Sequence, residues 1–267
     1  MKEEIIHLFK DKPEVYLKAY ETPFADPFAD ALLILPGGGY GFVSMDREGD
    51  PMAVAFSALG FRTFVLNYSI LEGARFPAPL VEASVAMHYI KANAKKYGID
   101  PERVFVLGFS AGGHLAASLG TLWRRVWREE KLDMPEGANR PCGMILSYPV
   151  ITWCEGTHKG TFYHAMGREN FTEEEVAPLC LDQQVSADTV PAFLWHTADD
   201  RAVCVENSFR MASALAKAGI SHEMHIFPHG PHGIATATRV TVPEKEFCDP
   251  RIARWPALAA EWMKTVK

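Results

Sequence analysis

One serine stands in a sequence context that suits a nucleophile. Gly108-Phe109-Ser110-Ala111-Gly112 matches G-x-S-x-G, in which a serine lies on a sharp turn between a strand and a helix. The apolar run from Arg103 to Leu107 predicts the strand, and the small residues from Gly113 to Leu119 predict the helix. Because the bare pattern also arises by chance, this context carries the inference. We interpret Ser110 as a nucleophile at the carboxyl end of a buried strand.

A serine hydroxyl needs a base to take its proton, and a histidine oriented by a carboxylate suits that task. Two aspartates, Asp199 and Asp200, follow one predicted strand, and two histidines, His229 and His232, follow the last one. Asp199 would also suit a turn, and His229 a loop hydrogen bond. His232 precedes a glycine in a loop within reach of a serine near the sheet centre. Asp199 stays open as an alternative to Asp200, and His229 as one to His232.

Three other histidines are interpreted as structural. His222 and His225 fall in or beside the last predicted strand, and His114 follows the glycines of the turn into a helix. A metal site would have to recruit histidines of the last strand and its loop together with Asp200. No H-E-x-x-H or comparable ligand spacing supports it. We predict neither a metal site nor a cofactor.

A triple glycine follows another predicted strand, in the run Pro36-Gly37-Gly38-Gly39-Tyr40. Its backbone must turn steeply or approach something closely, and it matches neither glycine-rich phosphate-binding pattern. Taken alone it suits a flexible turn. Acyl transfer, however, passes through an oxyanion that needs preorganised N–H donors. We predict that the amides of Gly38, Gly39 and Ala111 form this oxyanion hole.

The order of elements predicts the fold class. Strands and helices alternate, which is typical of an α/β protein with a mostly parallel sheet and helices on both faces. The segment 23–30 is a predicted connector and 123–140 a surface excursion or short helix. With no repeat or linker, residues 1–267 are predicted to form a single domain. Strands are expected at 15–20, 31–35, 61–68, 103–107, 143–148, 191–196 and 221–227, and helices at 51–59, 79–97, 113–119, 206–218 and 254–266.

The periodicity breaks down between about residues 149 and 190. A long irregular insertion at the carboxyl ends of parallel strands suits a small cap or binding loop, with a variable surface loop as the alternative. Its aromatic residues Trp153, Phe162 and Tyr163 offer faces for a sugar ring, although aromatic residues in a cap also form core. We predict that these three residues and Tyr40 contact the substrate.

The composition excludes several classes of partner. A formal net charge of -6 gives no reason to expect nucleic acid or an anionic membrane. The five cysteines are widely spaced with no C-x-x-C, which favours free thiols in a reducing compartment. The acidic start lacks the features of a signal peptide, and we predict a cytoplasmic protein. The oligomeric state stays open, a homo-oligomer included.

Several motifs together resemble a known family. They look like the acetyl-xylan-esterase-like branch of the α/β-hydrolases, which is related to hormone-sensitive-lipase-type esterases and to feruloyl esterases of gut bacteria. The order serine, aspartate, histidine is also that of α/β-hydrolases. The motifs are Pro36-Gly-Gly-Gly-Tyr40, Asp46-Arg47-Glu48, Gly108-Phe-Ser-Ala-Gly-Gly-His114, Trp195-His-Thr-Ala-Asp-Asp200, Val205-Glu-Asn-Ser208 and Phe227-Pro-His-Gly-Pro-His-Gly233.

The resemblance implies an α/β-hydrolase fold with Ser110, Asp200 and His232 as catalytic triad, and the Gly38/Gly39 loop with Ala111 as oxyanion hole. Departures from the family pattern occur at Pro36, Thr197 and Cys204, none of which removes a catalytic group.

The implied activity is that of a serine carboxylesterase. It would remove short acyl groups, above all acetyl, from a small-molecule ester of a sugar or xylo-oligosaccharide, through an acyl-enzyme. The same triad would also serve a feruloyl or general short-chain esterase, an arylformamidase or a peptidase. An alternative of another class is a catalytically silent hydrolase fold used as a ligand receptor, which usually lacks a triad member.

Overall fold

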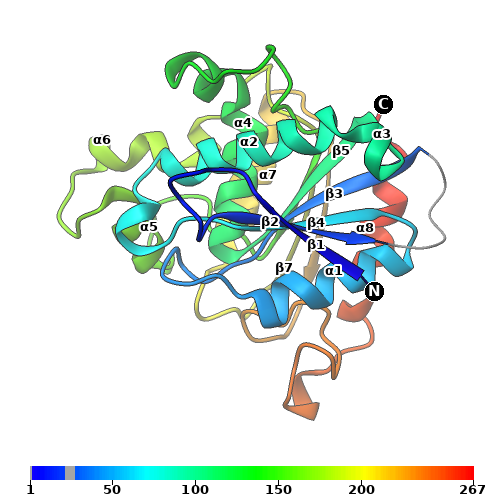
Figure 1. Cartoon of the computed structure of the whole chain (residues 1–267). Coiled ribbons are helices and arrows are strands. Elements are labelled where there is room, and N and C mark those ends of the chain that lie inside the picture. Colours follow the sequence, from blue (N-terminus) through cyan, green and yellow to red (C-terminus); the bar gives the residue numbers. More distant parts are fainter. Residues whose placement is uncertain (1, 22–27) are drawn as a thin grey trace.

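A sheet of eight strands runs through the middle of the computed structural model, which describes residues 2–21 and 28–267 (Figure 1). The strands are β1 (Lys2–His7), β2 (Tyr16–Glu21), β3 (Ala29–Leu35), β4 (Arg62–Asn67), β5 (Ile99–Phe109), β6 (Met144–Ser147), β7 (Ala192–Thr197) and β8 (His222–Phe227). Their order across the sheet is β1-β2-β4-β3-β5-β6-β7-β8. In this order, the strands from β4 through β8 are all parallel to one another. β2 pairs antiparallel with β4 on one side and with β1 on the other.

Helices cover both faces of this sheet. They are α1 (Asp50–Ala58), α2 (Ala78–Ala92), α3 (Ala94–Tyr97), α4 (Ser110–Glu129), α5 (Lys159–Met166), α6 (Glu173–Val176), α7 (Glu206–Lys217) and α8 (Trp255–Met263). Apolar residues of α2, α4 and α7 pack with Leu33 and Leu35 of β3, and those of α1 and α8 pack with Leu32 and Ile34. A strand that is buried on both faces has a continuous run of apolar residues in its sequence. The predicted α/β class is confirmed.

Several elements differ from the prediction, among them a divided helix at 79–97, which forms α2 and α3. The sequence analysis does not predict β1, a partly exposed edge strand that pairs with β2. The segment 123–140, predicted as a surface excursion or short helix, is helical only at its start, because α4 continues to Glu129 with Trp123 and Val126 on its buried face. Residues 23–27 of the predicted connector lie outside the described residues.

Two long connections follow the carboxyl ends of the parallel strands. The insertion, residues 149–190, joins β6 to β7 and carries α5 and α6. The second connection, residues 228–254, joins β8 to α8. Its later part, residues 234–254, is called the excursion and includes the orange segment at the lower edge of Figure 1. The irregular sequence pattern predicts the first connection but not the second. Within the described ranges, no helix is both long enough and apolar enough to cross a membrane.

Candidate active site

Ser110 occupies the sharp turn at which β5 ends and α4 begins. Its φ is 54°, in the left-handed region that residues other than glycine rarely adopt. Close backbone contacts surround the turn: a Cβ at Gly108 would lie 2.0 Å from the carbonyl oxygen of Gly112, and one at Gly112 would lie 2.1 Å from that of Leu35. Only glycine fits these two positions, and the serine is thereby held at the end of the strand.

The structure brings Ser110, His232 and Asp200 together in series. His232 Nε2 lies 2.9 Å from Ser110 Oγ, and its Nδ1 lies 2.7 Å from Asp200 Oδ2. The aspartate follows β7 and the histidine follows β8, so parallel strands deliver all three groups to the same edge of the sheet. With Nδ1–H donating to the carboxylate, Nε2 can accept the hydroxyl proton. This arrangement can activate the serine for attack on a carbonyl carbon.

Asp200 is held by its own turn as well as by His232. Its Oδ1 accepts the backbone N–H groups of Ala202 at 2.9 Å and Val203 at 3.0 Å, as aspartate does in an Asx turn. His196 Nε2 lies 3.4 Å from its Oδ2. Burial acts to raise the pKa of Asp200, but the bonds to His196 and His232 outweigh it and hold the pKa below its ordinary value. The carboxylate is therefore ionised at neutral pH.

The alternative residues form a second pair beside the first. His229 Nδ1 lies 3.0 Å from Asp199 Oδ2, and the N–H of Gly230 donates to Asp199 Oδ1 at 2.8 Å. The backbone bond from Gly230 and the bond from His229 lower the pKa of Asp199. Both side chains are exposed, and no hydrogen bond among the described residues joins this pair to Ser110.

The glycine loop lies against the serine. A Cβ at Gly37 would lie 2.9 Å from Ser110 Cβ, which places this loop in contact with the turn. Gly38 and Gly39 have φ values of 127° and 64°. Within the described part of the chain their N–H groups donate no hydrogen bond. The N–H of Ala111 belongs to the first turn of α4, where no intrahelical acceptor exists. The amides of Gly38, Gly39 and Ala111 thus have no protein acceptor within the described residues and are available as donors.

A buried glutamate links this loop to His232. Glu48 Oε2 accepts the N–H of Gly37 at 2.7 Å, and its Oε1 accepts the hydroxyl of Tyr148 at 2.7 Å. The Tyr148 ring packs edge-on against His232 with centroids 4.9 Å apart. Burial raises the pKa of Glu48, against the bonds from Tyr148 and Gly37. From the sequence, Glu48 stands out only as part of a family motif, because nothing local indicates that its side chain points inward.

Comparisons with known proteins agree with this fold. The BD-FAE family model matches residues 19–140, and the prolyl oligopeptidase family model matches residues 143–247. The crystal structure of an acetyl ester-xyloside bifunctional hydrolase from Caldicellulosiruptor lactoaceticus is 34% identical, with a TM-score of 0.84 over 98% of this chain and 96% of that one. This chain belongs to the α/β-hydrolase superfamily. The fold and family implied by its motifs are confirmed.

Two curated relatives of this α/β hydrolase are longer proteins. Endo-1,4-beta-xylanase B of Butyrivibrio fibrisolvens is 37% identical over 211 residues, which are 78% of this chain and 33% of that protein. Acetylxylan esterase of Xylanibacter ruminicola is 31% identical over 217 residues, 80% of this chain and 42% of that protein. The chain spans between a third and a half of the length of these relatives. Its similarity to esterases supports the predicted class of ester hydrolase.

Two histidines of the insertion lie against the glycine loop of this hydrolase. His158 caps α5, with its Nδ1 accepting the N–H of Thr161 at 3.2 Å, and a Cβ at Gly39 would lie 2.8 Å from its Cε1. Burial, then the nearby His232 and His164, lower the pKa of His158. His164 Nδ1 donates to the carbonyl oxygen of Gly39 at 2.8 Å. The insertion therefore narrows the space beside the amides, a role that the sequence analysis does not predict.

The structure corrects two of the four predicted substrate contacts. Tyr40 and Phe162 are fully buried, so neither side chain can touch a substrate. Tyr40 instead hydrogen-bonds His114 at 3.0 Å. Trp153 and Tyr163 are partly exposed but pack with centroids 6.2 Å apart, and Trp153 also packs against Phe162 at 5.5 Å. The aromatic residues of the insertion form a small core, the alternative that their residue type also allowed.

The three histidines interpreted as structural from the sequence make structural contacts. His114 Nε2 donates to the carbonyl oxygen of Leu179 at 3.0 Å, and burial lowers its pKa to about 4, so it is neutral at physiological pH. His225 pairs with Glu223 at 2.7 Å, and His222 with the carbonyl oxygen of Ile220 at 3.0 Å. Among the described residues, no three His, Cys, Asp or Glu side chains are grouped so that they could hold a metal ion.

Proposed function

We propose that this chain is a serine carboxylesterase that removes short acyl groups, acetyl above all, from esters of sugars or xylo-oligosaccharides. The observation that carries the proposal is the series Ser110 Oγ, His232 Nε2 and Nδ1, Asp200 Oδ2, joined at 2.9 and 2.7 Å. The acetyl esters named for two relatives support the substrate class. The histidines beside Gly39 favour a small acyl group, because they occupy space next to the amides.

In the proposed reaction, Ser110 Oγ attacks the ester carbonyl carbon while His232 Nε2 takes the hydroxyl proton. The carbonyl oxygen becomes an oxyanion that accepts hydrogen bonds from the amides of Gly38, Gly39 and Ala111. The intermediate collapses as His232 gives its proton to the alcohol oxygen, which leaves an acyl-serine. Water then attacks the acyl carbon while His232 takes one of its protons. As the bond from the acyl carbon to Ser110 Oγ breaks, His232 returns this proton to Oγ, and the carboxylic acid is released. Asp200 orients the imidazole and stabilises its cation.

A fluorophosphonate probe tests the nucleophile directly. We expect the label to map to Ser110 by peptide mass spectrometry and to be absent from Ser110→Ala, whose ester turnover should fall to background. Undiminished turnover by Ser110→Ala would remove the serine mechanism. Absence of both labelling and turnover in the wild-type protein would favour the silent receptor.

A substrate panel separates the reactions that share this triad. Rates on p-nitrophenyl acetate, acetylated xylobiose, methyl ferulate, N-formylkynurenine and an aminoacyl anilide distinguish acetylesterase, feruloyl esterase, arylformamidase and peptidase. We expect the two acetyl esters to have the highest kcat/KM. A preference for the anilide would instead follow the prolyl oligopeptidase similarity of residues 143–247.

A further inference from the structure

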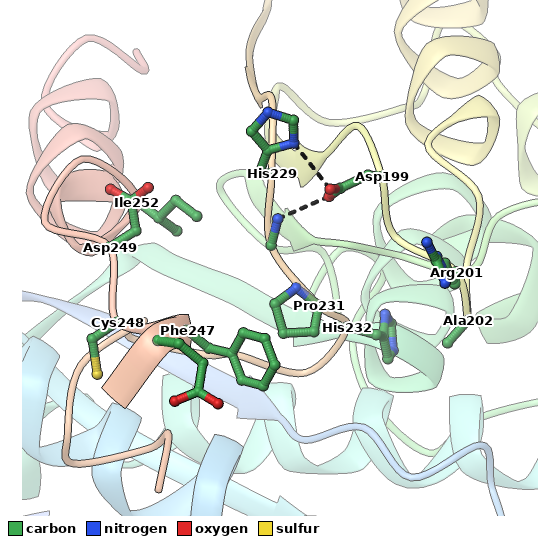
Figure 2. Close-up of a pocket in the computed structure, with 12 residues that line it drawn as sticks. Asp199, Arg201, Ala202, His229, Pro231, His232, Phe247, Cys248, Asp249 and Ile252 are labelled. Carbon is green, nitrogen blue, oxygen red and sulfur yellow. Dashed lines mark hydrogen bonds and ion pairs between the residues drawn. The ribbon is translucent and has the colours of Figure 1, made fainter. Parts of the chain in front are cut away.

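A cavity of about 570 Å³ opens beside His232 (Figure 2). It lies between the loop after β7, the loop after β8 and the excursion 234–254. Its size is in the ordinary range for small-molecule sites, ~300–1,000 Å³. None of its lining residues comes from the glycine loop or from the insertion, so it is separate from the amides beside Ser110.

The lining combines one exposed aromatic ring with charged groups. Phe247 is 40% exposed, and Figure 2 shows its ring pointing toward Pro231. Arg201 and Glu246 also line the cavity, and neither has an ion pair or side-chain hydrogen bond within the described part of the chain. An apolar ring surrounded by donors and acceptors of both charges suits a neutral polyhydroxy ligand, whose C–H face can cover the ring while its hydroxyls bond the rim.

The chemistry of ester cleavage indicates which part of the substrate binds in this cavity. When the tetrahedral intermediate collapses, the imidazole that took the serine proton must give it to the alcohol oxygen. The alcohol therefore lies against His232, and His232 is part of the wall of this cavity. The acyl group, by contrast, remains bonded to Ser110 beside the glycine loop.

We propose that this cavity binds the alcohol part of the ester, a pyranose sugar unit, with Phe247 as its stacking surface and Arg201 and Glu246 as hydrogen-bonding groups. The assignment rests on the proposed esterase function and adds to it the location of the sugar. It moves sugar recognition from the aromatic residues of the insertion to the excursion between β8 and α8.

Kinetics on two acetyl esters test the assignment. Phe247→Ala should raise KM for acetylated xylobiose about tenfold and leave kcat/KM for methyl acetate within about twofold, because the alcohol part of methyl acetate is too small to reach the ring. Phe247→Tyr, which keeps a ring, should behave like the wild type, whereas Phe247→Leu, which keeps apolar bulk, should resemble Phe247→Ala. The matched control is Phe209→Ala on α7, a phenylalanine that is 42% exposed outside the cavity.

Equal losses on both esters, or no loss on either, would overturn the assignment. Saturation-transfer NMR with unacetylated xylobiose separates its failure from that of the proposed function. If xylobiose binds the wild type but not Phe247→Ala while no ester is cleaved, the sugar site stands and the esterase proposal fails. If esters are cleaved but xylobiose binding does not depend on Phe247, the reaction stands and the sugar site fails.

Discussion

Two aspartate–histidine pairs lie side by side in this molecule, and among the described residues only one of them is hydrogen-bonded to a serine. Both join the loop after β7 to the loop after β8, with N–O distances of 2.7 Å for His232–Asp200 and 3.0 Å for His229–Asp199. Their surroundings differ: the side chains of the first pair are 22% and 0% exposed, those of the second 79% and 51%. The same two residue types, 32 residues apart in the first pair and 30 in the second, thus form a buried pair in one case and a surface ion pair in the other.

The neighbours of the first pair account for the difference. Tyr148 packs on His232, and His196 with two backbone amides surrounds Asp200. The second pair has only the amide of Gly230 as a further polar partner among the described residues. Since water screens an exposed ion pair, the second pair should contribute little to stability.

The largest predicted effect separates the two aspartates. Asp200→Asn should lower kcat on p-nitrophenyl acetate about 10⁴-fold, because the amide no longer fixes the reactive tautomer of His232. The matched change Asp199→Asn should lower it less than about threefold, since exposed pairs have small energies. Steady-state kinetics on both purified variants checks this. A larger loss in Asp199→Asn would reassign the carboxylate role.

The next prediction concerns the ring that shields His232. Tyr148→Phe removes the hydroxyl that donates to Glu48 and leaves one oxygen of that buried carboxyl without its donor. We expect the free energy of unfolding to fall by about 1–3 kcal/mol. The loss in kcat should be smaller than in Asp200→Asn, because the ring that packs against His232 remains. Urea denaturation measures the first effect. Unchanged stability would mean that another donor, such as water, replaces the hydroxyl.

The pH dependence of stability should follow the first pair. The pKa of Asp200 is lower in the folded protein than its ordinary value of ~3.9, so the unfolded chain binds more protons as the pH falls. The stability that ionised Asp200 contributes is therefore present above that ordinary value and is lost below it. As the pH falls from about 6 to about 3, the free energy of unfolding of the wild type should decrease relative to that of Asp200→Asn. A constant difference would contradict the lowered pKa.

The smallest effect is expected at the exposed histidine. His229→Gln should change the free energy of unfolding by less than about 0.5 kcal/mol, as for most surface substitutions. Its kcat on p-nitrophenyl acetate should stay within about twofold of the wild type, because no described contact joins it to Ser110. Thermal unfolding and steady-state rates check both values. A marked loss of kcat would show that the two pairs act together.

The sequence predicts the frame of the site because its signals are local. The apolar strands, the turn at Ser110 and the loops that carry Asp200 and His232 all lie where expected. The residues alone could not decide between Asp199 and Asp200. These two neighbours differ in burial, and the burial of a loop residue depends on elements that are distant in the sequence. The family resemblance, rather than spacing, selected Asp200.

The sequence is less informative about side-chain direction. Tyr40 and Phe162 were predicted to face a substrate and instead face the core, because an aromatic residue in an irregular segment carries no periodic signal. The same reason hides Phe247, which stands in the excursion where no pattern indicates a surface or a cavity. These residues acquire their roles from tertiary packing.

Glu48 has a consequence for redesign. One carboxyl group restrains the backbone at Gly37 and, through Tyr148, the wall behind His232. A change that loosens this anchor should degrade oxyanion binding and proton transfer together, so substitutions there should show correlated defects. The excursion between β8 and α8 meets this network at its start, where the N–H of Ala235 donates to the Tyr148 hydroxyl at 3.2 Å. New specificity is therefore better sought around Phe247, later in the excursion, than at that start.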